Sequence, residues 1–172
     1  MCLLLLAYQA HPDVPLLLGG NRDEFHSRSA AAPSVIARAP MIFAGQDLEA
    51  GGTWMGRNEH GMVAALTNRR DPAFVPPPNV RSRGEIVMGL LRTQDPAVAA
   101  SWLAAQPAEV YRPFSVLFGN RERFYYFSPR EVAAPKALTP GMYALSNSTL
   151  DDRSWPKVDR SLKFLDGERT VR

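Results

Sequence analysis

The amino-acid sequence predicts a layered fold of mixed composition, either α+β or an α/β sandwich. Short apolar segments bounded by turn residues come first, two segments with helical periodicity follow, and further short apolar segments come after them. The 172 residues, of which 45% are hydrophobic and 22% charged, suit one globular domain. We therefore expect a single domain over residues 1–172.

Two β-hairpins are predicted in the first 68 residues. Residues 3–8 and 14–18 are apolar, too short for a stable helix, and separated by turn residues. A second hairpin joins residues 52–57 to residues 62–68 through Asn-Glu-His-Gly, and the glycine at its end, Gly61, tolerates a positive φ.

Loops are predicted on either side of the second hairpin. Residues 21–40 are small and polar, and residues 69–83 contain three consecutive prolines that favour an exposed polyproline segment. We expect residues 25–50 and 69–83, both interpreted as loops, to line any ligand pocket. Phe25 and Trp54 are aromatic candidates for its wall, although core packing is the commoner role of a tryptophan.

The rest of the chain alternates between helix and strand. Apolar residues recur at helical spacing in the two segments after residue 83, and Pro96 suits the first turn of the second. The predicted elements are, in order, helices at 84–94 and 96–106, strands at 114–118, 123–127 and 142–145, and a helix at 154–165.

Composition argues against several functions. The net charge is only +3 and the basic residues are scattered, so no nucleic-acid partner is expected. The chain has one cysteine and three widely spaced histidines, so no metal site or cofactor is expected. It contains no apolar run of about 20 residues and no secretory leader, so we expect no membrane span and a cytoplasmic location. The oligomeric state is left open.

Cys2 is the first candidate for chemistry. Initiator methionine is generally removed before a small residue such as cysteine, and the mature chain would then carry a thiol and a free α-amine on one residue. The α-amine, with an ordinary pKa of about 7.7–8.0, could serve as the base for that thiol. The alternative is a small apolar residue that begins a strand.

Three further polar positions follow predicted strands. Asn21 to Glu24 come directly after an apolar run, and Asp23 could hold the ammonium or thiol of Cys2 in place. Asn68 and Asn147 each end a predicted strand, and an asparagine amide can donate to a developing oxyanion. Each of them could equally be an ordinary turn residue.

Together, these residues resemble the NRDE family, also called the transport and Golgi organisation protein 2 family. The resemblance extends from residue 2 to about residue 165 and includes several rare tetrapeptides in the right order. The matching segments are Met1-Cys2, Asn21-Arg22-Asp23-Glu24, Gly51-Gly52-Thr53-Trp54-Met55-Gly56, Asn58-Glu59-His60-Gly61, Ala65-Leu66-Thr67-Asn68, Arg83-Gly84, Leu145-Ser146-Asn147-Ser148 and Trp155-Pro156-Lys157-Val158.

That family is in turn similar to N-terminal-nucleophile (Ntn) hydrolases of the penicillin V acylase and bile salt hydrolase type. The resemblance implies a four-layer αββα sandwich, with Cys2 as nucleophile, Asp23 as the early acidic residue, Asn68 in the oxyanion hole and Asn147 as a second amide. NRDE relatives are usually longer, so we expect the C-terminal part of the sandwich to be missing.

Two functions follow from the resemblance. The first is hydrolysis of an amide C–N bond, with Asn21, Arg22 and Trp54 contacting the substrate. The second is binding or carriage of a small molecule, such as haem, a lipid or acyl-CoA, without catalysis, because a shared fold does not establish activity.

Overall fold

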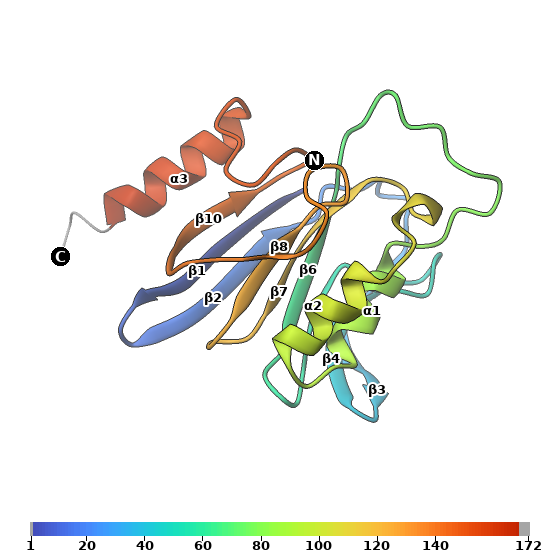
Figure 1. Cartoon of the computed structure of the whole chain (residues 1–172), viewed down its shortest axis with the longest axis horizontal. Helices are drawn as coiled ribbons and strands as arrows, with labels where there is room; N and C mark the ends of the chain where they lie inside the picture. The colour runs from blue at the N-terminus through green and yellow to red at the C-terminus, as the bar shows by residue number, and fades with distance from the viewer. Residues whose placement is uncertain (1, 169–172) are drawn as a thin grey trace.

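The computed structural model describes residues 2–168, which form two antiparallel sheets and three α-helices (Figure 1). This arrangement confirms the α+β class. The smaller sheet has the strand order β10-β1-β2. Its strands are β1 (Leu3–His11), β2 (Val14–Asn21) and β10 (Gly141–Leu145).

The larger sheet has seven strands in sequence order, from β3 to β9. Its strands are β3 (Ala30–Arg38), β4 (Met41–Asp47), β5 (Met55–Asn58), β6 (Val63–Asn68), β7 (Phe114–Gly119), β8 (Phe124–Phe127) and β9 (Lys136–Ala137). The helices are α1 (Gly84–Leu91), α2 (Pro96–Ala104), the short 3-10 helix η1 (Ala108–Val110) and α3 (Pro156–Glu168).

Alternating side chains on β1 join the smaller sheet to its two neighbours. Leu4 and Leu6 are buried in a cluster shared with Leu117 of the larger sheet. Leu3 and Leu5 point the other way and pack with Val158 of α3. Because successive side chains of a strand face opposite sides, this pattern places the smaller sheet between α3 and the larger sheet.

The larger sheet is covered by helices on its other face. Val116 and Phe118 of β7 are buried with Leu90 of α1 and Leu103 of α2. The layers therefore run from α3 through the smaller sheet and the larger sheet to the α1–α2 pair, and Figure 1 shows the helices on opposite sides of the strands.

The α1–α2 pair is fixed by a cap and by a close contact. The Asp95 side chain accepts hydrogen bonds from the backbone N–H groups of Ala97 and Val98, and Pro96 occupies the first helical position, as predicted. Gly89 faces the ring of Trp102 so closely that a Cβ at this position would lie 2.0 Å from a ring carbon. Glycine is therefore required where the two helices meet.

The predicted hairpins, helices and final strand are confirmed within a few residues. Gly61 has a φ of 82°, so the second hairpin turns at the predicted glycine. Residues 69–83 form a long loop outside the sheets, with one isolated bridge at Arg81 (Figure 1).

The prediction of loop over residues 21–40 and 25–50 was confirmed for residues 22–29 and 48–50 but was wrong for residues 30–38 and 41–47, where β3 and β4 form a paired hairpin. The signal was weak since β3 is an edge strand of mostly small residues, bonded to β4 alone. Its pairing register shifts between Ala31 and Ser34, around Pro33. A proline without an N–H is tolerated at such an edge.

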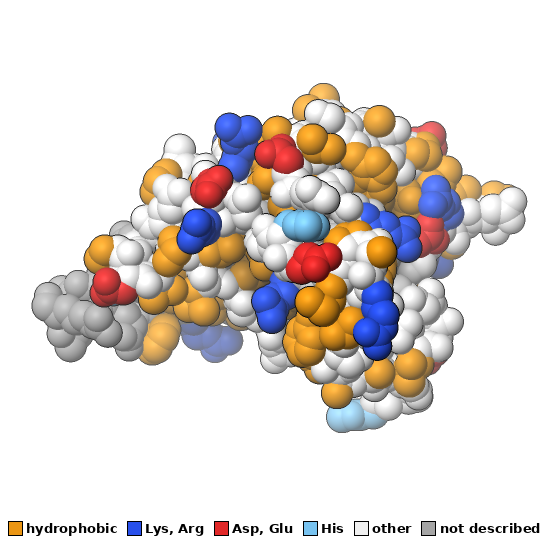
Figure 2. Space-filling view, turned by 90° about the horizontal axis from the view of Figure 1, so that it is seen from below, with side chains coloured by type: hydrophobic (Ala, Val, Ile, Leu, Met, Phe, Trp, Pro, Cys, Tyr) orange, Lys and Arg blue, Asp and Glu red, His pale blue; other side chains and the backbone are white. Residues whose placement is uncertain are grey.

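Charged side chains lie among hydrophobic ones on the face shown in Figure 2, with both signs interspersed. Within residues 2–168, no helix is both long and apolar enough to cross a membrane.

Candidate functional site

A cavity of about 390 Å³ lies where β1 begins and where β2 and β6 end. The connection from β4 to β5 and the residues before α1 complete its wall. The lining residues are Cys2, Leu4, Gly20, Asn21, Arg22, Glu24, Arg28, Asp47, Ala50, Gly52, Thr53, Trp54, Met55, Leu66, Asn68, Val80, Arg81, Ser82, Arg83, Gly84 and Arg112.

Cys2 lies in this wall, half-buried and directly before β1. Leu3 pairs with Asn21 across the antiparallel hairpin, and Cys2 and Arg22, the next residues outward, both line the cavity. The hydroxyl of Ser146 donates to the carbonyl oxygen of Cys2 at 2.8 Å. The thiol is thus held at the end of the smaller sheet where β1 begins and where β2 and β10 finish.

The two candidate asparagines meet across the gap between the sheets. Asn68 is exposed, lines the cavity and ends β6. Asn147 follows β10, and its Nδ2 donates to the carbonyl oxygen of Asn68 at 2.6 Å. Two neighbouring contacts strengthen the junction, because the Thr67 hydroxyl donates to Ser146 and the Arg70 N–H donates to Asn147.

Asn147 does not line the cavity and is only 6% exposed. Its Oδ1 is buried and, within the described part of the chain, has no hydrogen-bond partner. Buried polar atoms are rarely left unsatisfied, and an orphaned one costs about 1–3 kcal/mol. This oxygen is therefore an acceptor that a donor could satisfy.

Asp23 also lies outside the cavity wall. Its carboxylate is 3.2 Å from Nζ of Lys157 at the start of α3, and its side chain is 41% exposed. Hydrogen bonds from positively charged groups, the ammonium of Lys157 among them, lower the pKa of Asp23. The carboxylate therefore faces the positive charge of Lys157 on α3.

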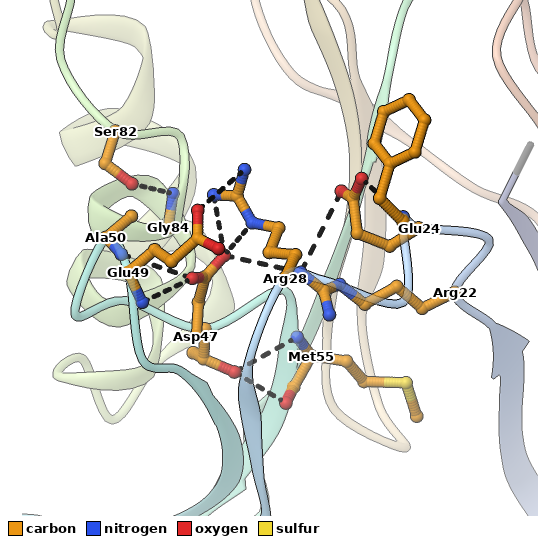
Figure 3. Close-up of polar contacts among 11 residues, drawn as sticks. Arg22, Glu24, Arg28, Asp47, Glu49, Ala50, Met55, Ser82 and Gly84 are labelled. Atoms are coloured by element: carbon orange, nitrogen blue, oxygen red, sulfur yellow. Dashed lines mark hydrogen bonds and ion pairs between the residues drawn. The ribbon is translucent and has the colours of Figure 1, made fainter.

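Arg22 and Arg28 converge on Asp47 inside the cavity (Figure 3). A guanidinium nitrogen of Arg22 lies 3.4 Å from the carboxylate, and one of Arg28 lies 2.9 Å from it. Arg22 also lies over the ring of Trp54, with 4.3 Å between its guanidinium carbon and the ring centroid. Trp54 is half-buried, so it both packs and contributes to the cavity wall.

Asp47 is the anchor of this group, and its side chain is 13% exposed. Burial opposes its negative charge, but N–H groups of Ala50 and Glu49 and the guanidinium of Arg28 outweigh that and hold the pKa of Asp47 below its ordinary value. The carboxylate is thus ionised and fixes both arginines in the wall.

Arg83 is a cavity residue for which the sequence predicted no role. It precedes α1, lies in the wall with Cys2, and donates to the carbonyl oxygen of Pro113 at 3.2 Å. Burial, together with the positive charges of Arg112 and Arg28, lowers the pKa of Arg83 to about 10. The Arg83-Gly84 pair belongs to the family pattern, and that pattern was the only sequence signal for Arg83.

The structure therefore brings five of the seven predicted site residues to one cavity: Cys2, Asn21, Arg22, Trp54 and Asn68. Asp23 and Asn147 lie outside it. The prediction that Phe25 lines a pocket was wrong, because its side chain is absent from this wall and Phe25 is 81% exposed. Among the side chains that the structure describes, no group of three or more His, Cys, Asp or Glu residues is arranged to hold a metal ion.

Fold and site together define a layered α+β protein with a cysteine- and arginine-lined cavity at the junction of its two sheets. The profile of the Transport and Golgi organisation 2 family matches residues 1–167, and the chain belongs to this family. The NRDE family is the same family, so the resemblance is confirmed.

Three similar proteins illustrate the relationship. The chain is 30% identical to the human Transport and Golgi organization protein 2 homolog and 29% identical to the mouse Transport and Golgi organization 2 homolog, each over 170 residues. Both alignments cover 92% of this chain and 60% of the relative. A protein of Saccharomyces cerevisiae described as uncharacterized, YGR127W, is 34% identical over 74 residues, which are 40% of this chain and 23% of that protein. The chain thus spans 60% of the length of its mammalian relatives.

Proposed function

We propose that the chain is an amide hydrolase of the N-terminal-nucleophile type, with Cys2 as nucleophile, on an αββα sandwich of the Ntn-hydrolase kind. The observation that carries the proposal is the meeting of Cys2 and Asn68 in one cavity. A thiol and an amide donor from different strands are the two groups that acyl transfer requires most. The order of layers, from α3 through two sheets to α1 and α2, supports the fold assignment.

In the proposed reaction, removal of the initiator methionine leaves the α-amine on Cys2. This amine takes the thiol proton, and Sγ attacks the carbonyl carbon of the amide. The tetrahedral intermediate then collapses, the C–N bond breaks, and the amine product leaves with the proton. Water hydrolyses the resulting thioester and restores the free thiol.

Three neighbours would support these steps. The side chain of Asn68, in the cavity wall, would donate to the oxyanion. The unpartnered Oδ1 of Asn147 would accept from the new ammonium of Cys2, which would satisfy a buried atom that is otherwise orphaned among the described residues. Asp23, which already faces positive charge, would orient the same ammonium.

Acylation by a strained cyclic amide tests the proposal. Purified protein is incubated with a β-lactam and followed by intact-mass spectrometry, which reports both methionine removal and adduct formation. Because Cys2 is the only cysteine, a thiol adduct has one possible site. We expect a chain without the initiator methionine to gain the mass of the lactam, and Cys2→Ser to form no thioester.

Asn68→Ala is expected to slow acylation about 10²–10³-fold, the usual effect of losing one oxyanion donor. Asn79→Ala is the matched control, because Asn79 is exposed and is not part of the cavity wall. Retention of methionine in the purified protein, or an equal rate in the Asn68 and Asn79 variants, would refute the mechanism.

Binding without hydrolysis is the second candidate, and the arginine-rich wall of the cavity favours it. A pocket needs no nucleophile to hold a ligand. Under this function, isothermal titration with acyl-CoA or spectral titration with haem should give equal affinities for wild type and Cys2→Ser, and no adduct should form with the lactam.

A further inference from the structure

The cavity wall carries more positive than negative charge. Five arginines contribute to it, against the two carboxylates of Glu24 and Asp47. The arginines are Arg22, Arg28, Arg81, Arg83 and Arg112. Some of these arginines are paired with carboxylates of the protein, and the others are available to pair with an anionic ligand.

Three of the five arginines have carboxylate partners. Arg22 and Arg28 share Asp47, and each has a second carboxylate at 3.9 Å, Glu24 for Arg22 and Glu49 for Arg28. Arg81 donates to Glu85, one helical turn further along the chain. These three side chains therefore need no ligand to balance their charge.

The other two, Arg83 and Arg112, have no carboxylate within 4.0 Å among the side chains that the structure describes. Arg83 is half-buried, and its hydrogen bond to Pro113 uses a single donor of a guanidinium that has five. Partial burial of a charge without a paired carboxylate is costly, and a second cation nearby raises that cost.

We propose that the cavity binds a small molecule with a carboxylate or phosphate group, and that Arg83 and Arg112 hold this anionic group beside Cys2. A planar guanidinium matches both kinds of anion through paired N–H donors. The N-terminus of α1, at Gly84 in the same wall, adds positive potential.

The inference rests on the proposed function only where it specifies the substrate, which would be an amide bearing an anionic group. Anion binding itself does not depend on hydrolysis. It fits the lowered pKa of Arg83, because an anion would add a directly paired negative charge to the attraction that Glu24 already exerts.

The single cysteine provides the probe. Cys2 is alkylated with iodoacetate, which is anionic, and separately with iodoacetamide, which is neutral and of similar size. Both reagents react with the same thiolate, so the ratio of their rates cancels any change in the thiolate population. Alkylation needs only an accessible thiol and proceeds even in a protein that hydrolyses no amide, so it separates failure of this inference from failure of the proposed function.

Arg83→Gln and Arg112→Gln are each expected to lower the ratio of iodoacetate to iodoacetamide rates about threefold to tenfold, the size of one screened charge at short range. Arg121→Gln removes the same charge from an exposed turn and should leave the ratio unchanged. Arg83→Lys keeps the charge and should retain most of the ratio, which separates a charge effect from a folding defect.

Inorganic phosphate and glutarate are then added separately, and the alkylation rate of Cys2 is measured with each. A bound anion should slow alkylation by both reagents in the wild type and in Arg121→Gln, and the anion that slows it at the lower concentration is the preferred one. Protection by either anion that is lost in Arg83→Gln supports the site. An unchanged rate ratio in both cavity variants, or protection by neither anion, overturns it.

Discussion

Replacing Asn58 is expected to destabilise the protein more than replacing the exposed Asn68 or Asn79. Asn58 ends β5 and is 2% exposed. Its Nδ2 donates to the carbonyl oxygens of Leu91 and Thr93, at 2.9 and 2.7 Å, and its Oδ1 accepts from the N–H groups of His60 and Met62, at 2.9 and 3.0 Å. One amide thus ties the second hairpin to the end of α1.

Asn58→Ala removes all four hydrogen bonds and leaves four backbone groups to find other partners. At about 0.5–1.5 kcal/mol for each bond, the expected loss in the free energy of unfolding is about 2–6 kcal/mol. For a chain of 172 residues, at about 2–4 °C for each kcal/mol, this corresponds to a fall in Tm of about 4–24 °C. Asn58→Asp should be at least as destabilising at pH 7, because its carboxylate would face two carbonyl oxygens instead of donating to them.

Urea unfolding at 25 °C, followed by tryptophan fluorescence, measures the change. Asn79→Ala is the matched control, and its loss should stay below about 0.5 kcal/mol because its side chain is exposed. A loss of less than about 1 kcal/mol for Asn58→Ala would mean that these four bonds do not hold the hairpin to the helix, and the reasoning from buried amides would fail for this residue.

Three further substitutions test other contacts. Asp47→Asn should cost about 1–3 kcal/mol at pH 7 by weakening the contact to Arg28. Because the pKa of Asp47 is lowered in the fold, the stabilisation by its carboxylate is present above the ordinary carboxyl pKa and is lost as the pH falls through the lowered value. The difference in urea midpoint between wild type and variant should therefore shrink between about pH 5 and pH 2, and a constant difference would contradict the assignment. Gly89→Ala should lower Tm through overlap with Trp102, at a cost of about 1–3 kcal/mol, and calorimetry showing no change would contradict the close contact. Asp95→Ala should cost about 1 kcal/mol in the same assay by removing the cap of α2, whereas Asp95→Asn should recover most of it.

Local patterns predicted most of the fold because most elements are specified by neighbouring residues. The second hairpin was predictable from a single glycine with a positive φ, and α2 from Pro96 at its start. The hairpin of β3 and β4 was not, since β3 is an edge strand whose residues neither alternate nor pack deeply. Its formation depends on pairing with β4, which no short window of the sequence reveals.

The site was predictable only where a residue type carried the chemistry. Cys2 and Asn68 could be proposed from their reactivity and from the family pattern, and both lie in the cavity wall. Asp47 could not, because its partners Arg22 and Arg28 are 25 and 19 residues away in the sequence and an isolated aspartate has no signature. No role was predicted for Arg83, because its importance comes from partial burial without a paired carboxylate, and burial is a property of the folded chain.

The cavity depends on a junction between segments that are distant in the sequence. Thr67 and Asn68 of β6 bond to Ser146 and Asn147 after β10, in each case across 79 residues, and Ser146 bonds in turn to Cys2. These contacts fix the smaller sheet against the larger one at the end of the sandwich that carries the thiol. The position of Cys2 relative to Asn68 is therefore set by the packing of the two sheets. A substitution that weakens this junction should also displace the two residues from each other.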